Sequence, residues 1–547
     1  MENGELKMDN AEPENHFPFS ILHSPFLSCL CILAVTLLVF TSCGSKPTDV
    51  RTVMPGDAQV YLESQDVGKA LRAVTEHEAF RKTAKTTPDL SALDGVRLAI
   101  AVTGFKKEDE QAGEQHVVGK VIPQFVAAAE TNAWNYQAIG FTENKLGEFI
   151  NDIYGGGVQL ERFPRHEGDY FVWTAQDGRK AYGLVIGSLV FFGNDESAIE
   201  KCVSVRKGEG DSFAKVGKLP AGDHLASGYV SPEGVGQISN IAAVQLAIGS
   251  GEEEESRRFI AAVLPEIVRN SISEVTWTAS KTETGMVDRH LLTLNPEIAQ
   301  VLNETMSPAS GASGELAAFL PNNAASVTQY SLKDPQIAWR SVLASLQKLT
   351  DPMRGQLIGT FADSLFEPYA VEASEPFFQS VGPEIFTATF DEEGEDAVVI
   401  ATIKDVNKLK TSVIKEIDLS KAPVSEFNAE IWRSEDGTQA VAISGNVVIL
   451  GHADGVIECL KARTEQQGAA RYPLQFTSGR SVSKTFDYDP EGIVSVVQVM
   501  ADKKDGEQAP ASVYLTETRF TPAGIEREVA SEFGLIGTII EQFAKEQ

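Results

Sequence analysis

The residue types that most often do chemistry are scattered along this chain. Beyond residue 50 no two histidines lie three or four positions apart, as zinc ligands on one helix would. The sequence has no His-Glu-x-x-His segment and no Cys-x-x-Cys segment. We therefore predict no metal site and no cofactor. We expect each of these histidines on the surface or in a loop: His77, His116, His166, His224, His290 and His452.

Signatures of nucleophilic catalysis and nucleotide binding are missing as well. There is no Gly-x-Ser-x-Gly elbow, no phosphate loop and no Rossmann fingerprint. Gly155-Gly156-Gly157 follows an expected helix, which favours a helix stop. Asp487 and Asp489 could offer two carboxylates to a cation, but no EF-hand spacing surrounds them. Glu252–Glu255 precedes an expected helix and favours compensation of the helix dipole. We assign no catalytic residue.

The N-terminal segment is predicted to direct the protein to the cell envelope. Ser24–Ser45 carries no charge, and its apolar core, Phe26–Phe40, has the length of a signal-peptide core and is short for a membrane span. It ends in Phe40-Thr41-Ser42-Cys43, which resembles a bacterial lipobox; the resemblance implies lipidation of Cys43. An uncleaved single-pass anchor over Ser24–Ser42 is the alternative. Either one places the remaining chain outside the cytoplasm, anchored to the cell envelope.

The composition is that of a globular protein with an acidic surface. Of 547 residues, 42% are hydrophobic and 23% are charged, which suffices for a core. The net charge is −30, and acidic residues are spread along the chain. Because nucleic-acid binding needs clustered Lys and Arg, this balance argues against a nucleic-acid partner.

The strongest pattern is a segment that occurs twice. Each copy has a Trp, an Asp-Gly pair, a second glycine turn and a Cys, in that order: Trp173, Asp177-Gly178, Gly187 and Cys202, then Trp432, Asp436-Gly437, Gly445 and Cys459. This pattern predicts two hairpins followed by a short helix. We expect the tryptophans to pack on a sheet and the glycines to adopt positive φ. We expect both cysteines to be buried and free rather than joined in a disulfide.

Further matches extend the duplication over most of the chain. They keep one order with slowly drifting spacing, as duplication followed by loop insertion produces. The matches are Pro55 with Pro321, the helices Asp66–Thr83 with Asp334–Leu349, Asn144-Lys145-Leu146 with Asn407-Lys408-Leu409, Pro232-Glu233-Gly234 with Pro490-Glu491-Gly492, and Gly285 with Gly524. The copies differ in helical runs at Gly236–Asn270 in the first and Met353–Phe366 in the second.

Long mixed units joined by hairpins predict an α+β fold. We expect two homologous lobes of mostly antiparallel sheet with helices packed on one face. The predicted division is residues 1–43 as signal with lipobox or as membrane anchor, 44–52 as tether, 53–306 as lobe 1, 307–318 as linker and 319–547 as lobe 2, a repeat of lobe 1.

The start of each copy and its hairpins support a family resemblance. Pro55-Gly-Asp-Ala58 and Pro321-Asn-Asn-Ala324, the hairpins ending in a helix and the lipobox together resemble an uncharacterised family of secreted bacterial α+β lipoproteins, a domain of unknown function, over about residues 50–535. The resemblance carries no catalytic residue to this chain.

These observations predict a non-enzymatic, envelope-anchored extracytoplasmic protein with a binding or structural role. A sheet face or a cleft between the lobes would bind a protein, a peptide or an apolar ligand, and membrane contact would be made through the N-terminal lipid or a single apolar helix. The alternative is an envelope hydrolase whose active-site groups come together only in the fold.

Overall fold

The computed structural model describes most of the chain after the N-terminal segment. The described residues are 48–77, 80–81, 89–111, 117–249, 254–282, 285–309, 315–321, 323–391, 394, 396–465, 492–500, 503–504, 507–508 and 512–538. The predicted signal or anchor with Cys43 lies outside these residues, as do Asp487 and Asp489.

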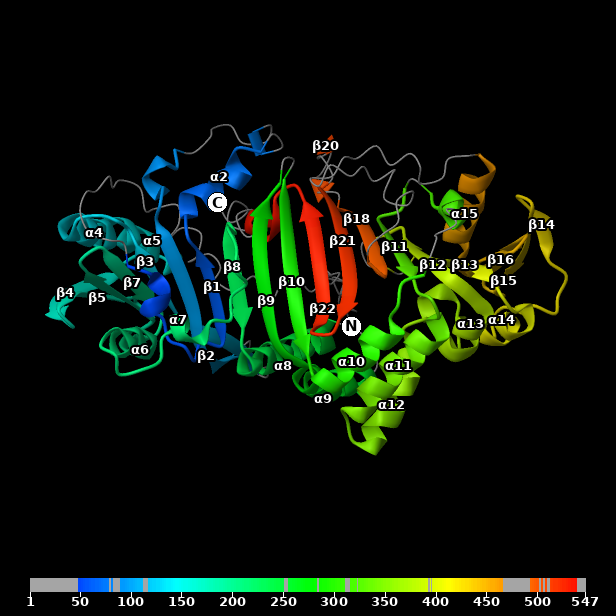
Figure 1. Cartoon of the computed structure of the whole chain (residues 1–547). Coiled ribbons are helices and arrows are strands. Elements are labelled where there is room, and N and C mark those ends of the chain that lie inside the picture. Colours follow the sequence, from blue (N-terminus) through cyan, green and yellow to red (C-terminus); the bar gives the residue numbers. More distant parts are fainter. Residues whose placement is uncertain are drawn as a thin grey trace, which may run out of the picture.

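One antiparallel sheet of 20 strands runs through the described parts of both repeats (Figure 1). From one edge to the middle, the first repeat contributes β4 (Gln159–Arg165), β5 (Gly168–Thr174), β6 (Lys180–Ile186), β7 (Leu189–Gly193), β3 (Val117–Glu130), β2 (Arg97–Gln111), β1 (Val60–Ser64), β8 (Ala226–Val230), β9 (Ile272–Lys281) and β10 (Met286–Leu294).

The second repeat continues the sheet in the reverse order. Its strands are β22 (Gly524–Ser531), β21 (Ser512–Thr521), β18 (Val494–Met500), β11 (Ser326–Ser331), β12 (Val381–Thr389), β13 (Ala397–Ile403), β17 (Val447–His452), β16 (Gln439–Ser444), β15 (Ala429–Arg433) and β14 (Val424–Glu426). A separate small hairpin joins β19 (Lys503–Lys504) and β20 (Glu507–Gln508).

The repeats join where their closing strands, β10 and β22, pair with each other. Met286 lies opposite Ser531 at one end of this pair and Thr293 opposite Gly524 at the other. Arg289 and Glu528 each follow the glycine of their own closing hairpin by four residues, so they are equivalent positions, and they lie opposite each other. An approximate two-fold axis therefore passes between Arg289 and Glu528.

The predicted α+β class with antiparallel strands is confirmed. Two separate lobes are not distinguished, because backbone hydrogen bonds between β10 and β22 continue one sheet across the junction. The outermost strand of an open sheet has backbone N–H and C=O groups without a strand partner. Here the closing strand of each repeat pairs with the closing strand of the other, so neither of them is an edge.

Helices lie at both faces of the sheet rather than at the single face that we expected. In the first repeat they are η2 (Val50–Thr52), α2 (Val67–Thr75), η3 (Ser91–Leu93), α4 (Asn135–Phe141), the π-helical turn η4 (Thr142–Leu146), α5 (Gly147–Ile153), α6 (Glu196–Arg206), α7 (Phe213–Val216), α8 (Pro232–Gly249), α9 (Glu254–Ser271) and α10 (Pro296–Thr305). In the second they are η5 (Leu316–Phe319), α11 (Pro335–Lys348), α12 (Pro352–Ser364), η6 (Glu367–Tyr369), α13 (Ser374–Ser380), α14 (Val406–Ser412) and α15 (Ala453–Thr464).

The alternation of side chains along β2 separates two cores. Leu98 and Ile100 pack with Leu71 of α2, and we call this side the α2 face. Ala99 and Ala101 pack with Cys202 of α6, and we call that side the α6 face. Both sides of β2 are therefore apolar and need helical cover, which a single helical layer could not supply.

The closing helices of the two repeats are exchanged. After β10, α10 packs on α11 of the second repeat, where Ile298 and Leu302 meet Val342. After β22, helical residues 534–538 pack on α2 of the first repeat, where Leu535 meets Ala73. Each repeat thus completes the apolar core of the other, which makes the two halves interdependent.

The two copy-specific helical runs also meet. The first forms α8 and α9, and the second forms α12. Arg354 of α12 pairs with Glu266 of α9, and the Asn270 side chain donates to the Leu349 carbonyl at 3.0 Å. In Figure 1, α8 to α12 gather along one end of the central strands. The insertions therefore reinforce the junction.

Strand register corrects one predicted match. Val60 of β1 pairs with Val230 of β8, and the equivalent Ser326 of β11 pairs with Gln498 of β18, so Val230 corresponds to Gln498. Pro232 consequently follows its strand, whereas Pro490 precedes the equivalent strand in the sequence. The two Pro-Glu-Gly segments are not equivalent, and their recurrence was misleading.

Register also shifts the two tryptophans relative to each other. Both are buried against the sheet, as predicted, and both lie on the α2 face. Trp432 lies opposite Val441, and counting back from the following glycine turn makes Val441 the equivalent of Gly183. Gly183 lies opposite Phe171. Trp432 therefore occupies the position of Phe171, and Trp173 lies two residues further along its strand.

The remaining local predictions for this segment are confirmed. Cys202 and Cys459 are free, fully buried and on the equivalent helices α6 and α15. Positive φ occurs at each predicted turn glycine: Gly178, Gly187, Gly437 and Gly445. A glycine there avoids the clash that a Cβ would make with the backbone.

Candidate functional site

Thr48, the first residue that the structure describes, is held by the sheet. Its backbone N–H donates to Oε2 of Glu130 at 3.0 Å, and Glu130 is buried at the end of β3. The next turn, η2, has the Asp49 side chain as its N-cap and buries Val50 completely. These contacts fix the point at which the predicted tether enters the sheet.

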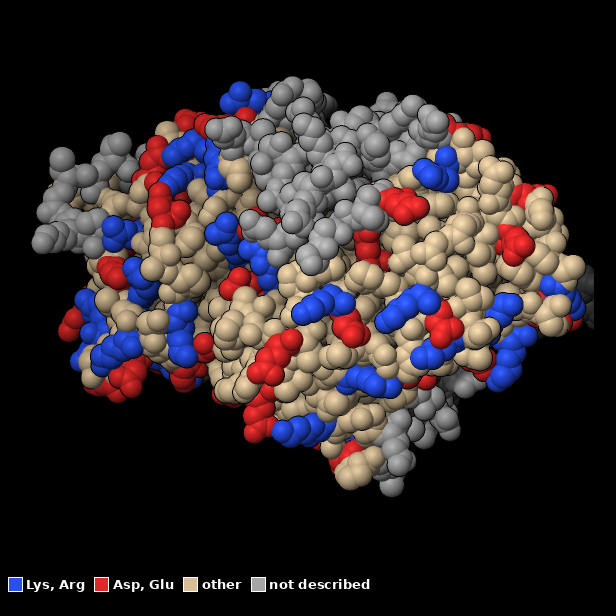
Figure 2. Space-filling view, turned by 45° about the vertical axis from the view of Figure 1, so that its right-hand side comes forward, with Lys and Arg blue, Asp and Glu red and all other residues tan. Residues whose placement is uncertain are grey.

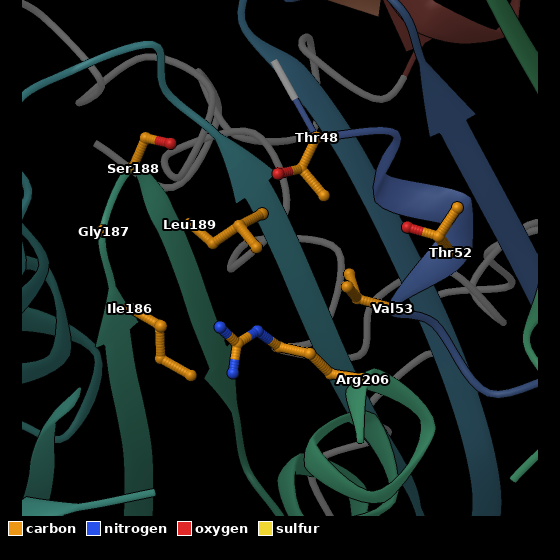
Figure 3. Close-up of a pocket in the computed structure, with 8 residues that line it drawn as sticks. All are labelled: Thr48, Thr52, Val53, Ile186, Gly187, Ser188, Leu189 and Arg206. Carbon is orange, nitrogen blue, oxygen red and sulfur yellow. The ribbon is translucent and has the colours of Figure 1, made fainter. Parts of the chain in front are cut away.

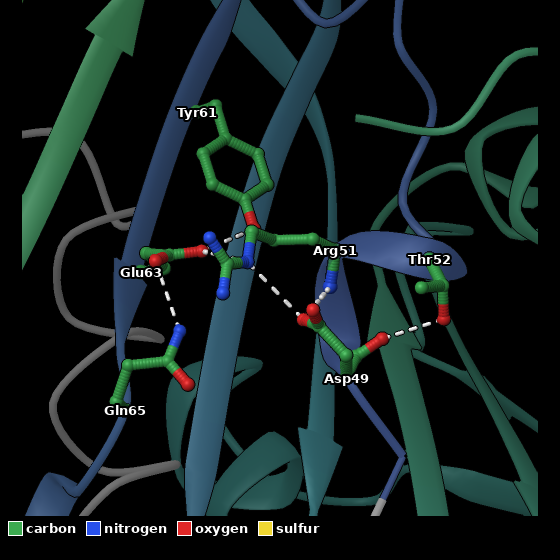
Figure 4. Close-up of polar contacts among 6 residues, drawn as sticks. All are labelled: Asp49, Arg51, Thr52, Tyr61, Glu63 and Gln65. Atoms are coloured by element: carbon green, nitrogen blue, oxygen red, sulfur yellow. Dashed lines mark hydrogen bonds and ion pairs between the residues drawn. The ribbon is translucent and has the colours of Figure 1, made fainter. Parts of the chain in front are cut away.

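A polar cluster holds η2 against β1 (Figure 4). The Tyr61 hydroxyl donates to Glu63 Oε2 at 2.9 Å, and Gln65 Nε2 donates to Glu63 Oε1 at 2.9 Å. Arg51 Nε lies 3.2 Å from Asp49 Oδ1 and 3.7 Å from Glu63 Oε2. Residues 61, 63 and 65 share one face of the strand because side chains alternate.

The electrostatics of this cluster favour a structural role. Burial, followed by the nearby Glu63 carboxylate, raises the pKa of Tyr61 well above its usual value, so the hydroxyl stays protonated and donates. Burial alone would lower the pKa of Arg51, but Glu63 and Asp49 raise it above its ordinary value. With both Glu63 oxygens engaged, the cluster locks the start of the fold to the sheet.

The second repeat replaces this cluster by other residues. Arg51 corresponds to Ala317, Tyr61 to Val327 and Glu63 to Gln329. The same strand arrangement forms without these side chains, so the cluster is a feature of the first repeat alone.

A shallow hollow of about 480 Å³ adjoins η2 on its other side (Figure 3). It is lined by Thr48, Thr52, Val53, Ile186, Gly187, Ser188, Leu189 and Arg206. In Figure 3 the Arg206 side chain extends across the hollow toward Ile186. A second hollow of about 650 Å³ lies beside the equivalent Gly445 turn and is lined by Ser425, Glu426, Phe427, Asn428, Ala429, Glu430, Ile443 and Gly445.

The two-fold axis lies in a row of polar side chains that crosses the junction. One residue on each of eight neighbouring strands takes part, each opposite the next: Glu63, Ser227, Thr278, Arg289, Glu528, Glu517, Ser495 and Gln329. We call these eight residues the polar row. Its ends, Glu63 and Gln329, are equivalent positions in the two repeats.

The polar row lies on the α6 face. Val287, two residues before Arg289, and Ala530, two residues after Glu528, both belong to the core on that face. Arg289 Nε binds Glu528 Oε2 at 3.0 Å, and Arg519 Nη2 binds the row residue Glu517 at 3.3 Å. The first of these ion pairs joins β10 to β22, and the second joins two residues of β21.

Exposure varies along the row. The Arg289 side chain is 70% exposed, and Glu528 is half-buried. The other six row residues are buried: Glu63, Ser227, Thr278, Glu517, Ser495 and Gln329. Glu526, two residues from Glu528 on the same face, is exposed. The accessible part is therefore charged, which suits a polar partner such as a protein or peptide better than an apolar ligand.

Basic and acidic side chains lie close together elsewhere on the surface too. On the face drawn in Figure 2 they are interspersed among uncharged residues. Ion pairs such as Lys69 with Asp223 and Lys201 with Asp57 also join opposite charges on the described surface. On the face drawn in Figure 2, acidic side chains are therefore mixed with basic ones rather than gathered in one patch.

Five of the six predicted histidines lie on different strands or loops of the fold, and His116 lies outside the described residues. His290 departs from the expectation of a loop or surface position: it lies within β10, opposite Arg527 across the junction. Burial and then Arg527 lower its pKa to about 4. His452 ends β17, 3.2 Å from Asp396. In the part of the chain that the structure describes, no group of three or more His, Cys, Asp or Glu could hold a metal.

Two contacts in the described residues involve Ser and His, residue types that take part in nucleophilic catalysis. His224 Nδ1 lies 3.2 Å from Ser280 Oγ, and its other ring nitrogen faces the Ala221 carbonyl at 3.3 Å rather than a carboxylate. The Ser374 hydroxyl donates to Asp363, but Ser374 is buried at the start of α13. Neither contact links a Ser, a His and a carboxylate as a catalytic triad does.

Among the residues that the structure describes, two carboxylates have raised pKa values, and they lie in different repeats. Burial raises the pKa of Asp288, although the Leu535 N–H and the Trp277 indole partly offset it. Burial raises that of Asp396 just before β13, against the opposing effect of His452. They do not form the acid pair that would favour a hydrolase.

Sequence reasoning missed both the η2 cluster and the polar row. The alternation Tyr61-x-Glu63-x-Gln65 was a usable signal for the cluster, because polar residues two apart share a strand face. The polar row had no such signal, since its members come from eight strands.

No described helix is long and apolar enough to cross a membrane. Comparison with protein-family models, with curated proteins and with solved structures found no match to this chain.

Proposed function

We propose that this protein is a non-enzymatic, extracytoplasmic protein that is anchored in the cell envelope through lipid on Cys43. Its continuous sheet serves as a rigid platform, and the exposed part of the polar row binds a protein or peptide partner. The lipobox resemblance of Phe40-Thr41-Ser42-Cys43 supports the anchor, and the family resemblance to secreted α+β lipoproteins agrees with it.

The polar row is the observation that carries the binding role. It draws residues from both repeats onto one face and has its centre at the two-fold axis between Arg289 and Glu528. A sheet braced by exchanged helices holds such a surface in place, so little ordering free energy is spent on binding.

Two measurements test the proposal. Metabolic labelling with a palmitate analogue compares the wild type with Cys43→Ala; unchanged labelling would overturn the lipid anchor and leave the uncleaved anchor over Ser24–Ser42. For binding, a photo-crosslinking amino acid replaces Glu526, which is exposed beside the row, or Val424 at the far sheet edge as the matched control. We expect a discrete envelope adduct from position 526 only. Equal adducts from both positions, or none from 526, would contradict a partner at the row.

A further inference from the structure

The tether between the lipid site and the fold is short. Thr48 is fixed by its hydrogen bond to the buried Glu130 carboxylate, and the following turn buries Val50. Cys43 lies five residues before Thr48. A fully extended chain of five residues spans at most about 18 Å. A lipid on Cys43 would therefore keep the Thr48 end of the protein within about 18 Å of the membrane surface.

An uncharged segment with exposed aromatic side chains begins directly after Glu130, the residue that holds Thr48. Residues 131–142 contain no Asp, Glu, Lys or Arg. The Trp134 side chain, at the start of α4, is 55% exposed, and Tyr136 is 70% exposed. Ala138 and Phe141 on the same helix are buried and hold α4 to the core. A Trp and a Tyr that are exposed on a helix packed on the core leave apolar ring surface in contact with water, and such exposed surface often marks an interaction site.

Glu130 connects the tether and this segment. One carboxylate oxygen accepts from the Thr48 N–H at 3.0 Å, and the other accepts from the Asn132 N–H at 3.1 Å. Trp134 is four residues from Glu130, so their Cα atoms are at most about 14 Å apart. The aromatic pair and the start of the tether thus belong to one end of the molecule.

We propose that Trp134 and Tyr136 insert into the headgroup region of the membrane to which Cys43 is attached. Trp and Tyr concentrate in that region because their rings are apolar and their N–H or O–H groups still find polar partners. The protein's net charge of −30 would be repelled by anionic lipid, and an uncharged segment is where close contact costs least. This inference rests on the proposed lipid anchor.

The contact would set the orientation of the whole molecule. In Figure 1, α4 and β14 lie at opposite ends of the sheet. With α4 at the membrane, the first repeat is proximal and the outer strands of the second repeat point away. The polar row at the junction is then held between these ends, within reach of a partner in the aqueous phase.

Intrinsic fluorescence tests the inference directly, since Trp134 is the most exposed of the chain's five tryptophans. Trp173, Trp277 and Trp432 are buried, and Trp339 is partly buried with its indole N–H bonded to Ser374 at 2.9 Å. The full lipidated chain is reconstituted in phosphatidylcholine vesicles with lipids brominated close to the headgroup. We expect a blue-shifted emission that these lipids quench, and loss of the quenched component in Trp134→Phe. Adding phosphatidylglycerol should not strengthen the quenching.

A matched probe controls for general proximity to lipid. In the Trp134→Phe background, Ile337→Trp places an indole at a 51% exposed position on α11 of the second repeat. We expect no quenching there. Equal quenching of both probes, or none at Trp134 in protein that carries the lipid label, would overturn the membrane contact and leave the anchor intact. Absence of label at Cys43 would overturn the anchor and this inference together.

Discussion

Arg289 and Glu528 are equivalent residues of the two repeats, and they bind each other across the junction with Nε 3.0 Å from Oε2. A residue that pairs with its own counterpart must lie on the two-fold axis. The duplication is therefore organised as an internal pair, in the way that two identical subunits share an isologous interface. Here the two positions have diverged to opposite charges, which a symmetric pair of identical residues could not have.

Charge reversal at this pair should act through cross-strand electrostatics. Glu528→Arg places like charges directly opposite each other at Arg289, although it also removes the like-charge pair of Glu528 with Glu517 on β21. We expect a net loss of up to about 0.5–1 kcal/mol in unfolding free energy, since the Arg289 side chain is mostly exposed. The double variant Arg289→Glu/Glu528→Arg should recover most of that loss in chemical denaturation. Equal stability of the single and double variants would show that the pair does not couple.

Asp288 should hold the exchanged C-terminal helix in place. Its carboxylate accepts from the Trp277 indole and from the Leu535 N–H, both at 2.8 Å. Asp288→Asn keeps only one acceptor oxygen, and we expect a loss of roughly 1.5–3 kcal/mol. Hydrogen exchange at the Leu535 amide should become faster. Asp396→Asn is the control: it removes the other raised-pKa carboxyl and should leave Leu535 exchange unchanged.

His290 should make the junction sensitive to acid. Its pKa in the fold is about 4, against an ordinary value of 6.5, because burial and Arg527 disfavour the charged ring. Between pH 6.5 and pH 4 the unfolded chain binds a proton at His290 that the folded chain does not bind. The contribution of His290 to stability is therefore fully present above about pH 6.5 and falls as the pH drops toward 4. The loss from this residue is at most about 3 kcal/mol.

His290→Gln isolates that contribution from other titrating groups. The unfolding free energy of the variant should change less between pH 6.5 and pH 4 than that of the wild type, as measured by denaturant titration at each pH. An identical pH dependence in both proteins would mean that His290 accepts a proton in the folded state.

The position of the Trp173 ring should require a glycine at residue 183. A Cβ added at Gly183 would lie 2.9 Å from two ring carbons of Trp173, which is buried and stacked on Phe171. Gly183→Val should cost about 1–3 kcal/mol by overpacking. A double-mutant cycle with Trp173→Ala checks the cause: the penalty should largely disappear once the indole is gone. Val441 occupies the equivalent place in the second repeat, where register puts Trp432 at the position of Phe171.

Cys202 and Cys459 should be inert in the folded protein. Burial raises the pKa of both thiols, and neither has exposed surface. Since the thiolate is the reactive form, we expect a thiol reagent to modify neither residue in native protein and both in denaturant. Mass spectrometry of tryptic peptides distinguishes the two sites. Native labelling at one site alone would show that its helix opens locally.

Local patterns in the sequence were sufficient for the hairpins, the turn glycines, the buried cysteines and the α+β class. Each depends on neighbours a few positions away: an Asp-Gly pair sets a tight turn, and alternating apolar residues set a strand. The same locality explains the error at Pro232 and Pro490. A three-residue match carries no information about strand partners, and only register shows that one segment follows its strand and the other precedes it.

By itself, the sequence determined that the chain is an acidic, internally duplicated α+β protein whose copies differ at α8, α9 and α12. The tertiary structure alone decided that the copies share one sheet, exchange their closing helices and place Arg289 against Glu528. Those outcomes depend on pairing between strands more than 200 residues apart, such as β10 with β22. The backbone of a closing strand offers the same N–H and C=O groups to solvent, to a strand of its own repeat or to a strand of the other repeat. Its partner is therefore decided only when the whole chain folds.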